Sequence, residues 1–325
     1  MMEPVGIIGL GAYLPSKVLT NFDLEKMVET SDEWIRTRTG ICERRIAGAD
    51  EKTSDMAAKA ASAALSNAKL SAESIDLILV ATISPDSSFP SMACKVQKAI
   101  GARNATAFDI SAACSGYLFA LTTAKQFILS GLYKNALVIA SERITNLVDW
   151  SDRGTCVLFG DGAGACVLSR SNTAVIKADF LSSQGDLGDL MEVVAEAPRA
   201  PGSTDNPAKA PFIVMQGQEL FKVAVNSMGD AVEEVLKRAG IDIKEVDCIV
   251  PHQANDRIIS AVAKKLKVSK DKFFINIDKY GNMSAASIAV ALYEAVKSKA
   301  IKKGDTVVLV AFGAGLVSGA NVVKW

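Results

Sequence analysis

The chain has 325 residues, of which 49% are hydrophobic, and its 36 basic and 36 acidic side chains give a formal net charge of +0. This length suggests one large or two ordinary domains, with enough apolar material for a sizeable core. The balanced charge gives no net positive electrostatic field that would attract nucleic acid or an anionic membrane to the whole molecule. Any anionic ligand must therefore be bound by a local cluster of basic side chains.

The amino-terminal stretch MMEPVGIIGLGAYLP lacks a basic segment and a small-residue cleavage site, and it is therefore not a secretory signal. The cysteines show no CxxC pair and no regular spacing, which predicts reduced thiols and a cytoplasmic location. Because the chain has a single histidine and scattered cysteines, its composition does not provide a set of zinc ligands, and we expect no metal site. The cysteines are Cys42, Cys94, Cys114, Cys156, Cys166 and Cys248.

Short β-branched runs alternate with helical segments along the chain, which predicts βαβ units and mostly parallel sheets. The apolar run 307–323 contains three glycines and much valine, so we interpret it as two buried strands around a tight turn and not as a membrane span. The predicted strands are 75–82, 106–110, 135–142, 246–250, 273–277 and 305–312, and the predicted helices include 114–131 and 256–266.

The two halves of the chain resemble each other. Segment 108–131 aligns with 275–298, and the glycine-rich stretch 160–169 aligns with 313–323. The helices of both repeats are apolar nearly all round, which indicates a helical layer between two sheets. Chance similarity of two βαβ segments is the alternative. We therefore predict an α/β fold of two duplicated halves, 1–172 and 173–325, with a long loop at 185–211 that resembles a lid or a pocket wall.

Three chemically useful side chains follow predicted strands of this duplicated fold. Cys114 lies at a strand-to-helix junction, where unpaired backbone N–H groups should lower the pKa of its thiol. The matching position of the second repeat is Asn282, and His252 follows the strand 246–250. A lone histidine is more often a packed or surface residue, but the carboxyl ends of strands are where α/β folds build their sites.

Six motifs are spread over almost the whole chain, namely TSDEWIRTRTGI (30–41), DISAACSGYLFAL (109–121), DRGTCVLFGDGAGA (152–165), PHQANDRII (251–259), YGNMSAAS (280–287) and AFGAG (311–315). Together they resemble the β-ketoacyl-acyl-carrier-protein synthase III family. The resemblance implies the thiolase fold, with its halves in a five-layer αβαβα arrangement, and the activity of the priming condensing enzyme of fatty acid synthesis.

The resemblance also implies roles for the three side chains. Cys114 would take an acyl group, most simply acetyl, from acyl-CoA as a thioester, with the oxyanion held by the backbone N–H groups of Cys114 and Ala314. His252 and Asn282 would receive malonyl-acyl-carrier-protein and stabilise the enolate left by decarboxylation. No metal and no redox cofactor is implied.

Substrate and partner contacts follow from the same resemblance. Trp34 and Arg38 resemble an adenine clamp, and a segment containing Phe89 is expected to reach into the acyl pocket of a partner, which predicts a homodimer. The basic stripe on the helix after His252 suits an acidic carrier protein, although a solvated helix face is the competing interpretation. Further substrate contacts are expected at Thr30, Arg153, Gly154, Gly217, Phe221, Ala254 and Asn255, and carrier-protein contacts at Lys222, Gln253, Arg257, Lys264 and Lys265.

Other interpretations stay open from the sequence. The family often has an aromatic residue where this chain has LVSG (316–319), and Gln218 replaces an expected asparagine, so the primer is not determined. A cysteine hydrolase could use the same three residue types. A nucleotide-binding protein is disfavoured because GLGAYLP and GDGAGA are not phosphate-binding motifs. Synthases of polyketide or alkylquinolone metabolism share the same three residues and are the closest rivals.

Overall fold

The computed structural model describes residues 3–193 and 212–325, and it contains a nine-stranded mixed sheet with helices on both sides. The strand order is β11-β12-β13-β8-β1-β7-β6-β4-β5. Two two-stranded sheets lie outside it, β2 (Lys17–Thr20) with β3 (Glu43–Ile46) and β9 (Met191–Val193) with β10 (Ile213–Met215). The sheet strands are β1 (Val5–Tyr13), β4 (Leu77–Ala81), β5 (Thr106–Ile110), β6 (Asn135–Glu142), β7 (Gly162–Arg170), β8 (Val175–Ser183), β11 (Cys248–Pro251), β12 (Thr306–Gly313) and β13 (Val317–Lys324).

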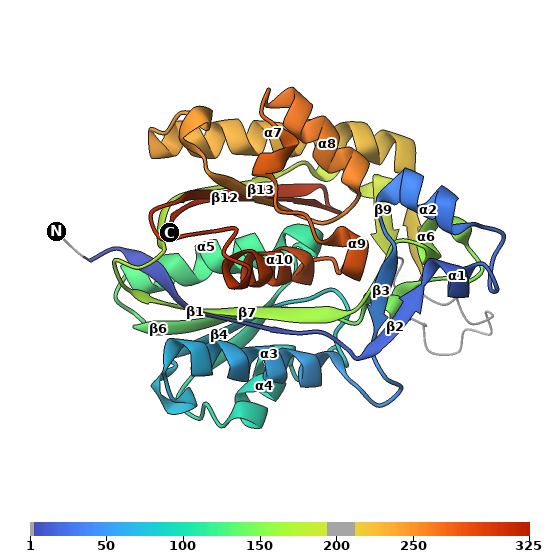
Figure 1. Cartoon of the computed structure of the whole chain (residues 1–325). Helices are drawn as coiled ribbons and strands as arrows, with labels where there is room; N and C mark the ends of the chain where they lie inside the picture. Colours follow the sequence, from blue (N-terminus) through green and yellow to red (C-terminus); the bar gives the residue numbers. More distant parts are fainter. Residues whose placement is uncertain (1–2, 194–211) are drawn as a thin grey trace.

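The sheet has two parts, β5-β4-β6-β7-β1 and β8-β13-β12-β11, which face each other across a central helical layer (Figure 1). The two parts meet at strands β1 and β8, which share one register pair, Gly6 with Val175. Helices α5 and α10 lie between the two parts, α3 and α4 cover one outer face, and α7 and α8 cover the other. The helices are α1 (Asn21–Leu24), α2 (Asp32–Thr39), α3 (Thr53–Ala68), α4 (Met92–Ile100), α5 (Gly116–Leu129), α6 (Arg153–Cys156), α7 (Gly217–Ala239), α8 (Asp256–Lys265), α9 (Ile277–Tyr280) and α10 (Ala286–Lys297).

Strict alternation along the strands builds three hydrophobic layers. In β4, Leu77 and Leu79 face the central helices, whereas Ile78 and Val80 face α3 and α4. In β12, the odd-numbered residues from 307 to 311 join the central core and the even-numbered residues from 308 to 312 pack under α7 and α8. Because both faces of each sheet are covered, the strands are continuous apolar runs, as parallel and mixed buried sheets require. The predicted five-layer thiolase fold is therefore confirmed, but the predicted mostly parallel pairing is wrong, because β1, β7, β8 and β13 pair antiparallel with their neighbours.

The duplication is visible in the pairing of the strands. In the first half β4 is parallel to β6, which is antiparallel to β7, which is antiparallel to β1. In the second half β11 is parallel to β12, which is antiparallel to β13, which is antiparallel to β8. The chain passes from the first set of strands to the second between Arg170 and Val175. The two halves thus repeat one topology and not only one sequence pattern.

The predicted strand 273–277 is wrong. Its counterpart in the first half is β5, which pairs with β4 over five residues, but here only Phe273 bridges to Ile249 of β11. The backbone N–H of Asn276 donates to the side chain of Gln253 at 3.1 Å, and α9 begins at the next residue. The buried side chain of Gln253 therefore takes the place of a neighbouring strand as hydrogen-bond acceptor. The β-propensity of residues 273–277 contains no information about this contact.

The predicted loop 185–211 contains regular structure in its described part. Residues 185–190 form a 3₁₀ turn, and β9 follows and pairs with β10 on the other side of the loop. Residues 194–211 lie outside the described residues. Among the helices of 3–193 and 212–325, none combines the length and the apolar character that a bilayer crossing would require.

Candidate active site

Cys114 lies where the chain leaves β5 and enters the central helix α5. A 3₁₀ turn at Ala113–Ser115 precedes the helix, and the backbone of Ala113 has a φ of +43°. The hydroxyl of Ser115 donates to the carbonyl of Val317 at 3.2 Å, which ties this turn to β13 of the other half. The thiol is therefore held at the amino-terminal end of a buried helix, as the sequence predicts.

The electrostatic expectation for this thiol is wrong. Burial raises the pKa of Cys114 to about 12, and the neighbouring Ser284 side chain lowers it only in part. Removing a thiolate from water costs more than the helix terminus returns, because the residue is only 5% exposed. Cys114 is consequently a protonated thiol in the wall of the cavity, and it needs a proton acceptor before it can act as a nucleophile.

His252 follows β11 directly. Its backbone N–H donates to the carbonyl of Val310 at 2.7 Å, so the residue continues the pairing of β11 with β12. The side chain is buried, and burial lowers the pKa of His252 to about 3. Its Nδ1 atom has no hydrogen-bond partner among the described residues. The imidazole is neutral at physiological pH and keeps one ring N–H to donate.

Asn282 lies in the loop between α9 and α10. Its backbone N–H donates to the carbonyl of Leu158 at 2.8 Å, and its carbonyl accepts from the N–H of Gly160 at 3.1 Å. The side-chain oxygen accepts from the backbone N–H of Ser284 at 2.8 Å. Because that oxygen is occupied, the amide NH₂ is the group that remains free to donate.

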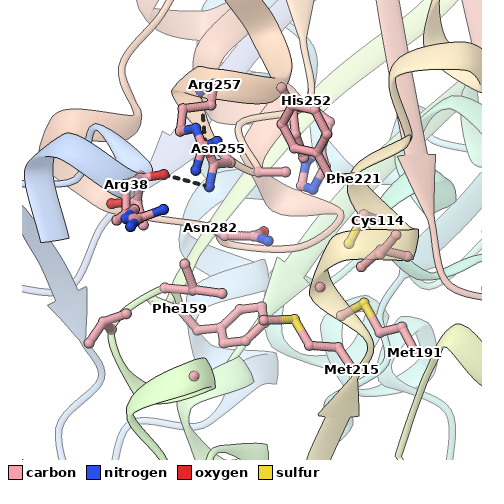
Figure 2. Close-up of a pocket in the computed structure, with 18 of the residues that line it drawn as sticks. Arg38, Cys114, Phe159, Met191, Met215, Phe221, His252, Asn255, Arg257 and Asn282 are labelled. Atoms are coloured by element: carbon pink, nitrogen blue, oxygen red, sulfur yellow. Dashed lines mark hydrogen bonds between the residues drawn. The ribbon is translucent and has the colours of Figure 1, made fainter. Parts of the chain in front are cut away.

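One cavity of about 270 Å³ brings the sulfur, the imidazole and the amide together (Figure 2). Cys114, His252 and Asn282 come from three different strand ends or loops of both halves, and all three line it. Its walls are largely apolar and include Phe159, Phe312 and two methionines of the β9–β10 sheet, Met191 and Met215. A thioester bound in this cavity would reach all three polar groups.

The turn after β12 approaches the Cys114 turn very closely. A Cβ atom on Gly313 would lie 2.6 Å from the backbone nitrogen of Cys114 and 3.2 Å from that of Ser115. Only glycine permits this approach. Ala314 follows immediately and lines, together with Ala113, an adjacent cavity of about 730 Å³. The two backbone segments predicted to form the oxyanion hole are therefore neighbours.

The residues predicted at the nucleotide end lie near the mouth of the site, and Trp34, Arg38 and Gly154 line the same cavity. The guanidinium of Arg153 lies 5.0 Å from the ring centroid of Trp34, and it also donates to the carbonyl of Glu29 at 2.9 Å. Arg38 lines the main cavity beside Trp34, and so does Gly154. Thr30 lines neither of the two cavities described above, and its buried hydroxyl has no hydrogen-bond partner among the described residues.

The residues predicted along the tunnel all line the main cavity, namely Gly217, Phe221, Ala254 and Asn255. Asn255 also caps α8, because its side-chain oxygen accepts from the N–H of Arg257 at 2.8 Å. Its amide donates to the carbonyl of Arg38 at 3.1 Å and links α8 to α2. The guanidinium of Arg257 lies 5.7 Å from the ring centroid of Phe221.

The predicted carrier-protein contacts divide into three groups. Lys222, Arg257 and Lys264 are exposed. Lys265 forms an ion pair with Asp230 at 2.8 Å and is partly buried. Gln253 is 0% exposed and donates to the carbonyls of Pro251 and Phe274, so a surface role for this residue is wrong. Its amide organises the loop that precedes α9.

Phe89 contributes to neither cavity of its own chain. Its side chain is 85% exposed, whereas Ser87 and Ser88, which precede it, line the cavity of about 730 Å³. The structure also places two polar residues beside the site that the sequence analysis missed, Glu142 and Ser284. A charged residue ending the continuous apolar strand 135–142 was the signal for the first.

Comparison with known proteins identifies relatives over the full length. The family model for 3-Oxoacyl-[acyl-carrier-protein (ACP)] synthase III matches residues 108–185, and the model for its C-terminal part matches residues 236–325. Beta-ketoacyl-[acyl-carrier-protein] synthase III of Caldanaerobacter subterraneus subsp. tengcongensis is 52% identical over 322 residues, 98% of this chain and 97% of that protein. The same-named protein of Clostridioides difficile is 52% identical over 326 residues, 100% of this chain and 99% of that protein.

Solved structures agree with these relatives. The crystal structure of 3-oxoacyl-[acyl-carrier-protein] synthase III from Aquifex aeolicus superimposes with a TM-score of 0.92 and 52% identity, covering 99% of this chain and 100% of the other. The priming β-ketosynthase of the R1128 polyketide pathway superimposes equally well, with a TM-score of 0.92, but at 33% identity, covering 99% of this chain and 96% of the other.

Proposed function

The chain belongs to the 3-oxoacyl-[acyl-carrier-protein] synthase III family, and from this premise we propose how its side chains carry out the priming condensation of fatty acid synthesis. The convergence of Cys114, His252 and Asn282 on one cavity is the observation that carries the proposal. Membership in the family makes the chain an acyltransferase that condenses an acyl primer with a malonyl unit. The division of labour among the three groups follows from their chemistry.

Cys114 forms the acyl-enzyme. Its sulfur attacks the carbonyl carbon of acyl-CoA, and the oxygen becomes an oxyanion that backbone N–H groups of Cys114 and Ala314 stabilise. The close contact between the Gly313 backbone and the Cys114 turn supports this pairing, because it brings the two segments into one rigid unit. The CoA thiolate then leaves, and the acyl group stays on the sulfur.

His252 and Asn282 act in the second half-reaction. Decarboxylation of malonyl-acyl-carrier-protein leaves a negative charge on the thioester oxygen, and two neutral donors stabilise it without forming a competing ion pair. The lowered pKa of His252 keeps the imidazole neutral above about pH 3, and the occupied oxygen of Asn282 directs its NH₂ outward. The resulting carbanion attacks the acyl-Cys114 thioester, and loss of CO₂ drives the condensation forward.

The nucleotide and the pantetheine arm lie along the main cavity. Trp34, Arg38 and Arg153 supply an aromatic face and cations for the adenine and its phosphates, with Thr30 and Gly154 beside them. Gly217 at the start of α7 leaves room for the arm, and the ring of Phe221 offers it an apolar wall. Ala254 and Asn255 border the inner part of the path.

The acidic carrier protein docks on the outer layer formed by α7 and α8. Lys222, Arg257 and Lys264 are exposed there, and Arg257 also lines the main cavity, so a docked carrier protein would present its pantetheine arm at that point. Lys265 contributes through its ion pair with Asp230, which holds α8 on α7. The chemistry needs no metal and no redox cofactor, since every step is performed by side chains and backbone groups.

The enzyme works as a homodimer in the cytoplasm. Among the described residues, strand β5 is an edge of the main sheet, so a strand of a second copy could pair along it. The exposed Phe89 would then enter the neighbouring copy's cavity of about 730 Å³, whose apolar lining includes Ile83, Leu147 and Ile213. This cavity holds the acyl chain of the primer.

A role in polyketide metabolism is not favoured, because the fatty-acid relatives share 52% identity with this chain and the polyketide enzyme shares 33%.

Mass spectrometry of the intact protein tests the proposal. Wild-type protein incubated with acetyl-, propionyl- and branched acyl-CoA is expected to gain the mass of one acyl group, with the best primer identified by rate. Cys114→Ser is expected to gain none within the same time. Wild-type protein that stays unmodified by every acyl-CoA, or a Cys114→Ser variant that is acylated as quickly, would disprove the role of this sulfur.

A further inference from the structure

A buried carboxylate that the reaction so far does not use ends strand β6. Glu142 is fully buried, and its Oε2 atom accepts hydrogen bonds from Thr82 Oγ1 at 3.1 Å, Ile83 N at 3.1 Å, Ser84 N at 3.2 Å and Ser84 Oγ at 2.5 Å. Within the described residues no lysine or arginine pairs with it, and the adjacent Arg143 donates elsewhere, to the carbonyl of Ala49. Burying an unpaired acid is costly, so such a group is rarely kept without a use.

The other oxygen of this carboxylate has spare capacity. In the part of the chain that the structure describes, Oε1 accepts one long hydrogen bond, from the N–H of Ile83 at 3.3 Å. The hydroxyl of Ser284 has no hydrogen-bond partner in the same described part, although the residue is 1% exposed. The backbone N–H of Ser284 is fixed on Asn282, so the hydroxyl is held inside the site. An unsatisfied buried hydroxyl and an under-used carboxylate oxygen are therefore left in the same interior region.

This region adjoins the nucleophile. A Cβ atom on Gly116, two residues after Cys114, would lie 3.1 Å from the Cβ of Ala81 and 3.5 Å from that of Ala285. Ala81 directly precedes Thr82, a partner of Glu142, and Ala285 directly follows Ser284. The start of α5 thus packs between the two segments that carry the carboxylate and the hydroxyl.

Ser284 influences the pKa of the two titratable groups beside it, Cys114 and Glu142. The Ser284 side chain lowers the pKa of both Cys114 and Glu142, and the charge of Glu142 raises the pKa of Cys114. Burial raises the pKa of Glu142 to about 7. Among the other titratable side chains that line the cavity, His252 is neutral and a weak base, and Arg38 and Arg257 are cations with no site for a further proton. Tyr117 of α5 interacts with Cys166 instead. Glu142 is the neighbouring base whose proton affinity falls in the physiological range.

We infer that Ser284 and Glu142 form a proton path that serves Cys114. In acylation the S–H proton passes to Ser284 Oγ while the Ser284 hydroxyl proton passes to the Glu142 carboxylate, and the sulfur forms its bond to the acyl carbon. The carbon–sulfur bond to CoA breaks, and the CoA thiolate takes its proton from water. This inference rests on the proposed function.

The same path returns the proton at the end of the cycle. When the malonyl-derived carbanion forms its carbon–carbon bond to the acyl group, the acyl–Cys114 bond breaks and the thiolate leaves. Glu142 then gives its proton to Ser284, and Ser284 gives its own to the sulfur. No group is oxidised or reduced, and Glu142 ends the cycle as a carboxylate. Ser284 exchanges a proton directly with the reacting sulfur and is therefore a catalytic residue of this path, whereas Glu142 acts through Ser284 and is a positioning residue.

The pH profile of acylation tests the path. In wild-type protein the rate of acyl-enzyme formation from acetyl-CoA, followed by rapid quench and mass spectrometry between pH 5 and pH 9, is expected to rise as Glu142 ionises near pH 7. Glu142→Gln keeps the size and the oxygen that accepts from residues 82–84, but it should lose this rise and react about 100-fold more slowly at pH 8. Ser284→Ala should lose the same rise, and the double variant should be no slower than either single variant.

Asp161→Asn is the matched control. Asp161 is another buried acid with a raised pKa, it accepts from Ala47 and Thr145, and it does not contribute to the pKa shift of Cys114, so this variant should keep the rise near pH 7. Alkylation of Cys114 by iodoacetamide gives a second readout that needs no acyl-CoA, and it should show the same inflection in wild-type protein and lose it in Glu142→Gln. An inflection that persists in folded Glu142→Gln or Ser284→Ala, or strictly additive losses in the double variant, would overturn the inference. Acylation failure of wild-type protein with a normal alkylation profile would instead count against the proposed function.

Discussion

His252 is the residue whose environment differs most from what its isolated chemistry suggests. A histidine usually exchanges its proton near neutrality, but enclosure between the strand ends holds this one neutral. A neutral imidazole cannot form an ion pair with the malonyl carboxylate, and it can still donate a hydrogen bond to the enolate oxygen. The single histidine of the chain is thus a donor by virtue of its burial.

This neutrality predicts a specific loss of stability in acid. The unfolded chain binds a proton on His252 below about pH 6.5, whereas the folded chain does so only near pH 3, so stability falls as the pH drops through this window. Between pH 7 and pH 5 the wild type should lose about 2 kcal/mol more than His252→Gln in the free energy of unfolding. Urea unfolding at each pH measures this difference. The contribution of Glu142 to the pH dependence of stability cancels in the comparison, because both proteins contain this residue. Equal losses in the two proteins would show that His252 titrates normally.

At the scale of elements, the β12–β13 turn determines whether the oxyanion hole exists. Gly313→Ala places a methyl group 2.6 Å from the backbone nitrogen of Cys114, and the turn must move away. We expect acyl-enzyme formation to slow by about 100-fold, the usual effect of losing one oxyanion donor. Gly48→Ala is the control, since its nearest neighbour would be at an ordinary 3.8 Å. Acylation of Gly313→Ala at the wild-type rate would show that this turn does not hold the oxyanion.

The contact between β7 and α10 is the second element that positions the site. A Cβ atom on Gly164 would lie 2.5 Å from the Cβ of Ala289, so the helix can approach the sheet only over a glycine. Gly164→Ala should destabilise the fold by about 1–3 kcal/mol through overpacking. Thermal unfolding measures this cost, with Gly185→Ala as a control that meets no atom within 4 Å. A Gly164→Ala variant as stable as the control would mean that the layers separate easily.

Most elements near the site could be predicted from the sequence, because their signals are local. The bounds predicted for β5 and β6 are those of the structure, and the helix after Cys114 begins two residues later than predicted. The strand predicted at 273–277 failed because Gln253, a residue distant in sequence, occupies the hydrogen-bonding position of a strand neighbour. The same buried amide removed Gln253 from the predicted carrier-protein surface.

The electrostatics of the site could not be predicted in the same way. A helix terminus beside Cys114 is visible in the sequence and suggests a lowered thiol pKa, but the degree of burial depends on the β12–β13 turn and the Asn282 loop. The cation over Trp34 likewise depends on tertiary folding, since Arg153 and Trp34 are far apart along the chain. The sequence therefore predicts which residues form the site, but it does not predict how deeply each of them is buried.

At the scale of the whole molecule, the duplication explains why one site needs both halves. Each half contributes only some of the site's side chains, which lie at or after its strand ends. The first half supplies Cys114, and the second half supplies His252 and Asn282. The central layer of α5 and α10 joins the halves and directs both sets of strand ends to one cavity (Figure 1). The balanced net charge leaves partner recognition to local patches.

The patch on α7 and α8 makes a prediction at this scale. Arg257→Ala should raise the KM for malonyl-acyl-carrier-protein by about five- to tenfold, because an exposed cation facing an acidic partner is lost. The rate of acylation from acyl-CoA measured at saturation should change little, and added salt should reduce the difference between the variant and wild type. Lys98→Ala on α4, in the opposite outer layer (Figure 1), is the control. A KM unchanged in Arg257→Ala would place the carrier protein elsewhere.

The most direct test of the whole account is a single-turnover chase of the acyl-enzyme in Asn282→Ala. The account predicts that this variant is acylated by acyl-CoA as completely as wild type, because Cys114 and the Gly313 turn are intact. After addition of malonyl-acyl-carrier-protein, wild type should lose its acyl group within one turnover, whereas the variant should keep it at least 100-fold longer. An Asn282→Ala acyl-enzyme that discharges into 3-ketoacyl product at the wild-type rate would contradict the separation of roles around the shared cavity.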